Sequence, residues 1–346
     1  MRFDDKYRQD VRDVLEGVPN LHRLRRKRIL VTGGSGLIGA AIVDLLCVLN
    51  ADCGWDMKLI LAGRSAERLK DRFSWLGGIS YVFRKFDLMT DALTDDTDYI
   101  MHCAGICSPK LYAQRPVDTM LSIVQGTKTV LDAARERGVG RTLVLSSSEI
   151  YGVSPSNEPF KEGDYAYVDL LKSRACYASG KRAAETLCAA YASQYGLDVV
   201  ILRPGHIYGP PILDSDDRVP AQFSRCVMAG RDIVLKSSGE SLRSYCYALD
   251  CAGAALTVLV NGVAGEAYNV SNAASVVTIR DFAECVARAS GVKVVFADPS
   301  DAERKGFNPM NNSSLDARKL EKLGWTGRFS LPEGVERMLR YADWPD

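Results

Sequence analysis

The positions of hydrophobic residues divide the chain into two parts of different regularity. From Lys27 to about Pro210, short apolar runs alternate with longer segments whose apolar residues recur at helical spacing. The expected strands are RILVT, KLILA, YVFRKFD, DYIMHCAG, TLVLSSS and VVILRP. The expected helices cover residues 37–49, 65–75, 117–137 and 174–195. Because apolar strands separated by amphipathic helices form parallel sheets covered on both faces, the pattern predicts an α/β fold with a doubly wound parallel sheet.

The ends of the chain depart from this alternation. Residues 5–17 carry one helical stripe, formed by Val11, Val14 and Leu15, which predicts an accessory helix within an extension over residues 1–26. The sheet domain is expected over residues 27–210. Residues 211–346 are expected to form mainly a smaller C-terminal lobe over the carboxyl edge of the sheet, where ligands bind, with some return to the core. Helices are expected there near residues 219–229, 250–261, 278–290 and 331–342.

Composition favours a small-molecule substrate. The 44 basic and 43 acidic residues of the 346-residue chain nearly cancel, so no charge excess indicates a nucleic acid polymer or an anionic membrane as partner. The first 25 residues lack an apolar signal core, and no uncharged apolar run approaches 18 residues. Ten cysteines without a CxxC pair predict reduced thiols, and three histidines in separate contexts predict no metal site. A cytoplasmic location is therefore expected.

A glycine-rich run lies between the first expected strand and helix. Thr32 to Gly39 reads TGGSGLIG, with glycines at positions 33, 34, 36 and 39. Small residues at this place allow a tight turn, the approach of a pyrophosphate to the helix N-terminus, and close packing of helix on strand. The run predicts a dinucleotide site.

The end of the second strand leaves the choice of dinucleotide open. An acidic residue about 20 positions after the glycines would bind the ribose diol of NAD, but this chain has Ala62, Gly63, Arg64 and Ser65 there. The guanidinium of Arg64 can pair with the 2′-phosphate of NADP, or it can stack on adenine.

Tyr177 and Lys181 are four residues apart in CYASGKRAAE, which places them on one face of a helix. An ammonium beside a phenol is expected to lower the pKa of Tyr177 from about 10 toward neutrality and to make it a general base. The strand TLVLSSS delivers Ser146, Ser147 and Ser148 to the same edge of the sheet.

Together these motifs resemble the extended short-chain dehydrogenases/reductases of the NAD-dependent epimerase/dehydratase family, over roughly residues 28–341. The resemblance includes Asp98 to Gly105 as DxxxHxAG, the GP at 209–210 and RSYCYALD at 243–250. Three stretches resemble UDP-glucuronate decarboxylase, also called UDP-xylose synthase. They are SPKLYAQRPVDT at 108–119, SSEIYG at 147–152 and SRACYASGKRAAETLCAAY at 173–191.

The resemblance implies a Rossmann domain with a substrate-binding lobe and assigns site residues by position. The implied cofactor contacts are Gly33, Gly36, Leu37, Ile38, Gly39, Arg64, Asp87, Leu88, Ala104, Tyr177, Lys181 and Pro204. The implied catalytic residues are Ser147, Glu149, Tyr177 and Lys181. The implied substrate contacts are Ser148, Glu149, His206, Arg218 and Arg243. For Ser146 and Ser148, capping of the loop is the preferred alternative; Asp87 could be a plain strand end, and Glu149 a solvated loop residue.

Departures from the resemblance bear on the substrate. The decarboxylases carry acidic residues where this chain has Ala178 and Ser179, and Asn where it has His206. A 4,6-dehydratase would carry Asp and Glu in place of Ser148 and Glu149, which counts against dehydration.

Three functions remain open at this stage. The favoured hypothesis is a nucleotide-sugar decarboxylase or 4-epimerase that oxidises carbon 4 transiently, which a tightly bound NAD would serve. The others are an NADP-dependent reductase of a non-sugar carbonyl compound, favoured by Arg64, and a non-catalytic NADP-sensing protein. The resemblance also implies a homodimer formed through the helix carrying YxxxK and its neighbour.

Overall fold

The main sheet has seven parallel strands. The computed structural model describes residues 4–76, 81–212, 216–301, 304 and 307–342. The strand order is β10-β6-β5-β4-β1-β2-β3, so the chain winds in both directions from β1 and confirms the doubly wound sheet. The strands are β1 (Arg28–Thr32), β2 (Lys58–Gly63), β3 (Tyr81–Lys85), β4 (Tyr99–His102), β5 (Arg141–Leu145), β6 (Val199–Pro204) and β10 (Ala267–Val270).

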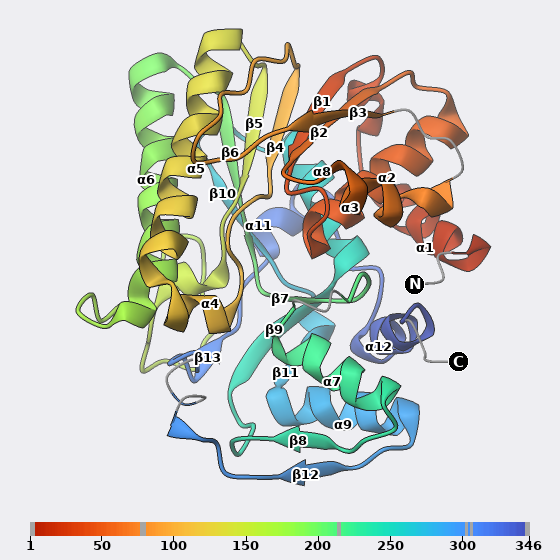
Figure 1. Cartoon of the computed structure of the whole chain (residues 1–346), viewed down its shortest axis with the longest axis vertical. Helices are drawn as coiled ribbons and strands as arrows, with labels where there is room; N and C mark the ends of the chain where they lie inside the picture. Colours follow the sequence, from red (N-terminus) through yellow and green to blue (C-terminus); the bar gives the residue numbers. More distant parts are fainter. Residues whose placement is uncertain (1–3, 77–80, 213–215, 302–303, 305–306, 343–346) are drawn as a thin grey trace.

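Helices cover both faces of this sheet (Figure 1). The helices α5 (Pro116–Arg137) and α6 (Cys176–Tyr195) pack together on one face, and α2 (Leu37–Cys53) packs on α8 (Ala248–Asn261) on the other. Residues 37–49 of α2 are buried nearly throughout, because the apolar residues of α2 cover its whole circumference. Shorter helices are α3 (Ala66–Arg72) and α4 (Pro109–Gln114).

A second lobe follows the carboxyl edge of the main sheet (Figure 1). Its sheet contains β7, β9, β11 and β13, and a separate pair joins β8 to β12. These strands are β7 (His206–Tyr208), β8 (Ile233–Leu235), β9 (Leu242–Tyr247), β11 (Val276–Thr278), β12 (Val294–Phe296) and β13 (Asn312–Ser313). The helices are α7 (Val219–Met228), α9 (Ile279–Ser290), α11 (Arg318–Glu321) and α12 (Leu331–Arg340). Because β10 returns to the main sheet between β9 and β11, the chain enters the second lobe twice, after β6 and again after β10.

The N-terminal helix α1 (Asp5–Glu16) is held by buried polar contacts. Tyr7 is fully buried and donates its hydroxyl proton to Asp44 of α2 at 2.7 Å. On the same helix, Asp10 accepts from Arg337 Nε at 2.9 Å and from the hydroxyl of Tyr341 at 2.7 Å. These contacts connect α2, which packs on the main sheet, with α12 near the C-terminus.

Three further observations bear on the predictions from composition. All ten cysteines lie in the described part of the chain, and none is in a disulfide. Six of them are buried, whereas Cys53 and Cys107 are exposed. No described helix has the length and apolar character to cross a bilayer, and no three potential metal ligands gather among the described residues.

We predict that Tyr7→Phe destabilises the protein by about 2 kcal/mol, because it removes a hydrogen bond to a buried carboxylate. The midpoint of urea denaturation measures this loss. The control is Tyr165→Phe, at a tyrosine that is 67% exposed, where a change below about 0.5 kcal/mol is expected. Equal midpoints for the two variants would contradict the assigned role of α1.

Candidate active site

A cavity of about 1280 Å³ lies where the carboxyl edge of the main sheet meets the second lobe. The carboxyl ends of parallel strands share one edge, so the segments after β4, β5 and β6 meet there. Residues of the lobe close the opposite wall. Of the predicted site residues, those that line the cavity are Ile38, Ala104, Ser147, Ser148, Glu149, Tyr177, Lys181, Pro204, His206, Arg218 and Arg243.

The glycine-rich turn has the close contacts that a dinucleotide cradle needs. Gly33 has φ +71°, and a Cβ on it would lie 2.7 Å from the amide nitrogen of Ala104. A Cβ on Gly39 would lie 2.3 Å from the carbonyl oxygen of Gly33. Gly36 is the N-cap of α2 and supplies no side-chain cap, so amides of the first helical turn are left for an anion. The turn therefore fits a bound pyrophosphate.

The remaining predicted cofactor contacts lie away from the cavity. Arg64 is exposed at the end of β2 and forms no ion pair with the residues that the structure describes. A carboxylate oxygen of Asp87 accepts from the amide of Met89 at 2.9 Å, and Leu88 packs against Gly126 of α5. Leu37 is buried in the core. The structure thus brings the predicted nicotinamide contacts together in the cavity and leaves the predicted adenine contacts Arg64, Asp87 and Leu88 outside it.

The tyrosine and lysine of YxxxK lie one turn apart on α6. Lys181 Nζ donates to the carbonyl oxygen of Leu145 at 2.6 Å and lies 6.0 Å from the centre of the Tyr177 ring. Burial lowers the pKa of Lys181 below its ordinary value. Burial also raises the pKa of Tyr177 well above 10, and the nearby Cys107 and Glu149 act in the same direction. The expectation of a lowered tyrosine pKa is therefore wrong for the chain by itself.

The three serines after β5 have different surroundings. Ser147 is half-buried on the cavity wall, and its hydroxyl accepts from the amide of Glu149 at 3.2 Å. A hydrogen bond with Ser147 lowers the pKa of Tyr177, in opposition to burial. Ser148 also lines the cavity but is buried, and Ser146 donates its hydroxyl to a carboxylate behind the strand. Ser147 is thus the serine that the structure joins to the tyrosine.

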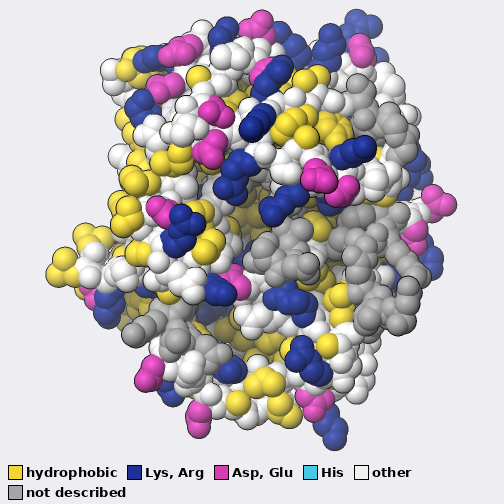
Figure 2. Space-filling view, viewed as in Figure 1, with side chains coloured by type: hydrophobic (Ala, Val, Ile, Leu, Met, Phe, Trp, Pro, Cys, Tyr) yellow, Lys and Arg dark blue, Asp and Glu magenta, His cyan; other side chains and the backbone are white. Residues whose placement is uncertain are grey.

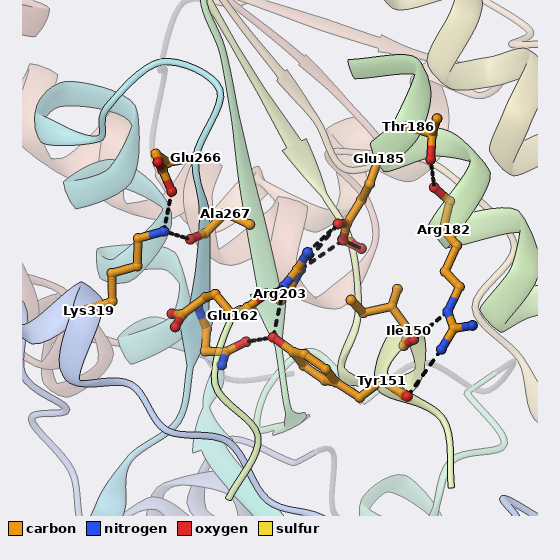
Figure 3. Close-up of polar contacts among 12 residues, drawn as sticks. Ile150, Tyr151, Glu162, Arg182, Glu185, Thr186, Arg203, Glu266, Ala267 and Lys319 are labelled. Atoms are coloured by element: carbon orange, nitrogen blue, oxygen red, sulfur yellow. Dashed lines mark hydrogen bonds and ion pairs between the residues drawn. The ribbon is translucent and has the colours of Figure 1, made fainter. Parts of the chain in front are cut away.

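A polar network that includes Tyr151, Glu185 and Arg203 adjoins the turn after β5, and Figure 3 shows the contacts among these three residues. Glu185, one turn after Lys181 on α6, accepts the Ser146 hydroxyl and pairs with Arg203 of β6 at 2.6 Å. Arg203 also donates to the hydroxyl of Tyr151 at 3.0 Å, which in turn donates to Asn269 at 2.6 Å. Strands β6 and β10 and helix α6 are therefore tied to the turn that carries Ser147.

Sequence analysis missed three residues at the centre of the site. Arg174 pairs with both carboxylate oxygens of Glu149, at 2.9 and 3.0 Å. Tyr112 of α4 stacks on Tyr177, with ring centres 4.5 Å apart, and Cys107 Sγ lies 3.9 Å from the Tyr177 hydroxyl. Tyr112 and Arg174 stand within two of the stretches that resemble decarboxylases, so that resemblance was the available signal.

The lobe contributes basic residues to the cavity. Arg243 is 3% exposed and donates to the carbonyl oxygen of Leu242 at 2.8 Å; no carboxylate of the described chain pairs with it. Arg218, in contrast, forms a bidentate pair with Asp216 at 2.9 and 2.6 Å. Burial lowers the pKa of His206 well below 6.5, and the charges of Arg243 and Arg218 add to this effect. His206 is therefore neutral beside an arginine whose charge is not compensated by an ion pair.

Two of the three histidines and the departures from the decarboxylases can now be placed. His102 is buried in β4, with Nδ1 2.8 Å from the hydroxyl of Thr32, and burial lowers its pKa to about 3. Ala178 and Ser179 do not line the cavity, whereas His206 does. Of the three departures from the decarboxylases, only His206 is therefore placed to contact a ligand in the cavity.

Comparison with known proteins agrees with this fold. UDP-glucuronic acid decarboxylase 6 of Arabidopsis thaliana is 31% identical over 316 residues, which are 90% of this chain and 87% of that protein. A UDP-N-acetylglucosamine 4-epimerase structure from Methanobrevibacter ruminantium has TM-score 0.78 and 23% identity. The superposition covers 92% of this chain and 98% of the Methanobrevibacter ruminantium chain. The NAD complex of a UDP-glucose 4-epimerase from Thermus thermophilus has TM-score 0.74 and 26% identity. That comparison covers 91% of this chain and 98% of the Thermus thermophilus chain.

The family model agrees with these similarities. The model described as the NAD dependent epimerase/dehydratase family matches residues 29–271, which contain the glycine-rich turn, YxxxK and the lobe strand with Arg243. The expected resemblance is confirmed, and the chain belongs to the NAD dependent epimerase/dehydratase family.

Proposed function

We propose that this protein binds NAD tightly and modifies a nucleotide-linked sugar by transient oxidation at carbon 4. The observation that carries the proposal is the lining of one cavity. It brings the buried Tyr177 and the half-buried Ser147 and Lys181 of the sheet edge together with a buried Arg243 of the lobe, which has no carboxylate partner in the described chain. The first three residues suit proton removal from an alcohol, and the fourth suits an anionic group on the same substrate.

Three residues of the chain would have separate roles in the reaction at carbon 4. Tyr177 accepts the proton of the sugar hydroxyl, Ser147 donates a hydrogen bond to the reacting oxygen, and Lys181 favours the phenolate. When bound, NAD supplies a hydride acceptor for carbon 4 and a positively charged ring. Such a charge is needed because burial alone raises the pKa of Tyr177 well above 10. The product of this step is a 4-keto sugar.

Arg243 supports a substrate that carries negative charge. A guanidinium buried without a carboxylate is costly, and an anionic ligand removes that cost. Its planar donors suit a diphosphate or a carboxylate. The name of the Arabidopsis thaliana relative, a UDP-glucuronic acid decarboxylase, supports a nucleotide sugar with both groups.

We favour decarboxylation as the finer assignment. The carboxylate of a uronic acid lies β to the ketone at carbon 4 and can leave as carbon dioxide, with the electron pair passing to the carbonyl oxygen as an enolate. A proton taken up at carbon 5 and return of the hydride to carbon 4 would then give the pentose and restore the oxidised cofactor. Glu149 lines the cavity and supports this outcome over epimerisation, since epimerases commonly have a small or neutral residue there. The relative of Xenopus tropicalis, UDP-glucuronic acid decarboxylase 1, is 30% identical over 91% of this chain. Reduction of a non-sugar carbonyl compound by NADPH remains the second candidate, because Arg64 is exposed and forms no ion pair with the described residues.

We also propose a homodimer formed by α5 and α6 of two copies. Large hydrophobic side chains are exposed on α5 and on the loop before α6, and Figure 2 shows hydrophobic side chains along this edge of the molecule. They are Val117 (67%), Met120 (39%), Leu121 (48%), Tyr165 (67%), Tyr167 (67%), Leu170 (72%) and Leu171 (99%). Pairing of two copies would remove this area from water.

The function is tested by incubating the purified protein with UDP-, GDP-, dTDP- and CDP-linked sugars and recording mass spectra. We predict loss of carbon dioxide from a nucleotide-linked uronic acid without net consumption of NAD. Tyr177→Phe is expected to lower kcat by at least about 10³-fold, because the general base is lost. Retained activity in the Tyr177→Phe variant would refute the assignment of Tyr177 as the general base. Net oxidation of NADPH would support the reductase, and no turnover by the wild-type protein would refute the proposed function.

We predict that Arg243→Gln raises KM for the nucleotide sugar by about 100-fold, because a charged hydrogen-bond donor to the substrate is lost. Initial-rate kinetics measure this, with Arg231→Gln as the control at an exposed arginine. An unchanged KM would exclude Arg243 as the anion contact.

We predict that Leu121→Glu converts the dimer to a monomer, because a carboxylate would be buried in the apolar interface. Light scattering after size-exclusion chromatography gives the mass. Val263→Glu is the control, at a valine that is 60% exposed on another part of the chain. A monomeric wild-type protein, or a variant that stays dimeric, would contradict the assigned interface.

A further inference from the structure

We propose that Arg174 is a positioning residue, which fixes the carboxylate of Glu149 beside Tyr177 and is itself held by Tyr112. The inference rests on the proposed function and adds two residues to its machinery. Neither was predicted from the sequence as a site residue, although both line the cavity.

The contact between Arg174 and Glu149 has the geometry of a fixed pair. Two parallel hydrogen bonds join them, from Nη1 to Oε2 at 2.9 Å and from Nη2 to Oε1 at 3.0 Å. Their side chains are only 13% and 17% exposed, so water screens the pair weakly. A bidentate guanidinium restricts both the position and the plane of a carboxylate. Glu149 can therefore present its charge to the cavity in one orientation.

Aromatic packing connects this pair to the proposed base. The guanidinium carbon of Arg174 lies 4.8 Å from the centre of the Tyr112 ring. The same ring is stacked on Tyr177 with an interplanar angle of 17°. Tyr112 and Tyr177 are 2% and 5% exposed, so the stack has little freedom to move. Displacement of Arg174 would thus disturb both Glu149 and the packing of Tyr177.

The chain places these residues close to the reacting groups along the sequence as well. Arg174 is in the short turn η4 (Ser173–Ala175) that enters α6, three residues before Tyr177. Glu149 is in the turn η3 (Ser148–Tyr151), two residues after Ser147. The ion pair therefore ties the turn that leads into the proposed base to the turn that follows the proposed serine.

The ion pair between Arg174 and Glu149 also affects the stability of the Tyr177 phenolate. The negative charge of Glu149 raises the pKa of Tyr177, and so opposes the form of the tyrosine that accepts a proton. Arg174 places a compensating positive charge against that carboxylate. Without it, the cavity would hold a poorly solvated and unpaired carboxylate near the base, which is unfavourable.

A neighbouring arginine shows what a purely structural contact looks like in this part of the chain. Arg182, also on α6, donates to the carbonyl oxygens of Ile150 at 2.7 Å, Tyr151 at 3.1 Å and Ala166 at 2.9 Å (Figure 3). Those bonds hold a loop and reach no carboxylate. Arg174 instead donates to a side chain that lines the cavity.

The experiment compares kcat and KM for the wild-type protein, Arg174→Gln, Arg174→Lys, Glu149→Gln and the Arg174→Gln/Glu149→Gln double variant. The substrate is the nucleotide sugar that the wild-type protein converts. Lys172→Gln is the matched control, because Lys172 lies two residues from Arg174, is 77% exposed and pairs with Asp169 at 3.2 Å. It is expected to behave as the wild-type protein.

We expect Arg174→Gln to lower kcat about 100-fold, as misplacement of a reacting group does, while KM changes less than about 3-fold. Arg174→Lys keeps the charge without the bidentate geometry and is expected to lose about 10-fold. Because Arg174 acts through Glu149, the double variant should be no more than about 3-fold slower than Glu149→Gln. A kcat of Arg174→Gln within about 3-fold of wild type, or losses that multiply in the double variant, would overturn the proposal.

Thermal unfolding of the same proteins separates this inference from the proposed function. If the wild-type protein converts no nucleotide sugar, the proposed function fails, but the cycle of melting temperatures still tests the ion pair. A double variant that loses less than the sum of the single losses supports the pair. Additive losses overturn it, whatever the substrate is.

Discussion

A lysine and a tyrosine buried one turn apart on α6 form the constraint on which the rest of the site depends. Burial disfavours both the ammonium of Lys181 and the phenolate of Tyr177. Each charged form therefore depends on stabilising hydrogen bonds or charges from neighbouring groups. The chain supplies Lys181 with the carbonyl oxygen of Leu145 rather than with a carboxylate. The positive charge of Lys181 therefore remains available to a phenolate and to a bound ligand, instead of being cancelled by an acidic side chain.

The other charges around the cavity follow from this constraint. Glu149 and Glu185 lie close enough to affect Tyr177 and Lys181 respectively, and each is paired with an arginine, Arg174 or Arg203. Such pairing keeps the carboxylates from moving toward the lysine, which would remove its effect on the tyrosine. It also explains why the network in Figure 3 lies directly behind the serine turn: a misplaced carboxylate there would alter the base without touching it.

The sequence predicted the elements that periodicity defines and failed where contacts are non-local. Strands such as RILVT and helices such as residues 117–137 were predicted to within a few residues, because their apolar residues recur at one period. The strands of the lobe and the main-sheet strand β10 were missed; β10, β11 and β13, for example, have four, three and two residues, too few to define a period. In α1, the stripe of Val11 and Val14 was found, but the buried Tyr7 and Asp10 were not, because their partners lie at residues 44, 337 and 341.

At the site, too, spacing along the sequence predicted local neighbours but not the effects of non-local contacts. Spacing along one helix gave Tyr177 and Lys181 correctly as neighbours, yet it gave the wrong direction for the tyrosine pKa, because spacing contains no information on burial. Among the departures, Ala178 and Ser179 lie outside the cavity, whereas His206 is neutral and lies on its wall with Arg243. A neutral imidazole can donate one hydrogen bond where the side-chain amide of Asn can donate two, and its ring occupies more of the cavity. Of the three departures, only His206 can therefore alter contacts with a ligand directly, and it does so on the wall that holds Arg243, away from the Tyr177 and Lys181 pair of the sheet edge.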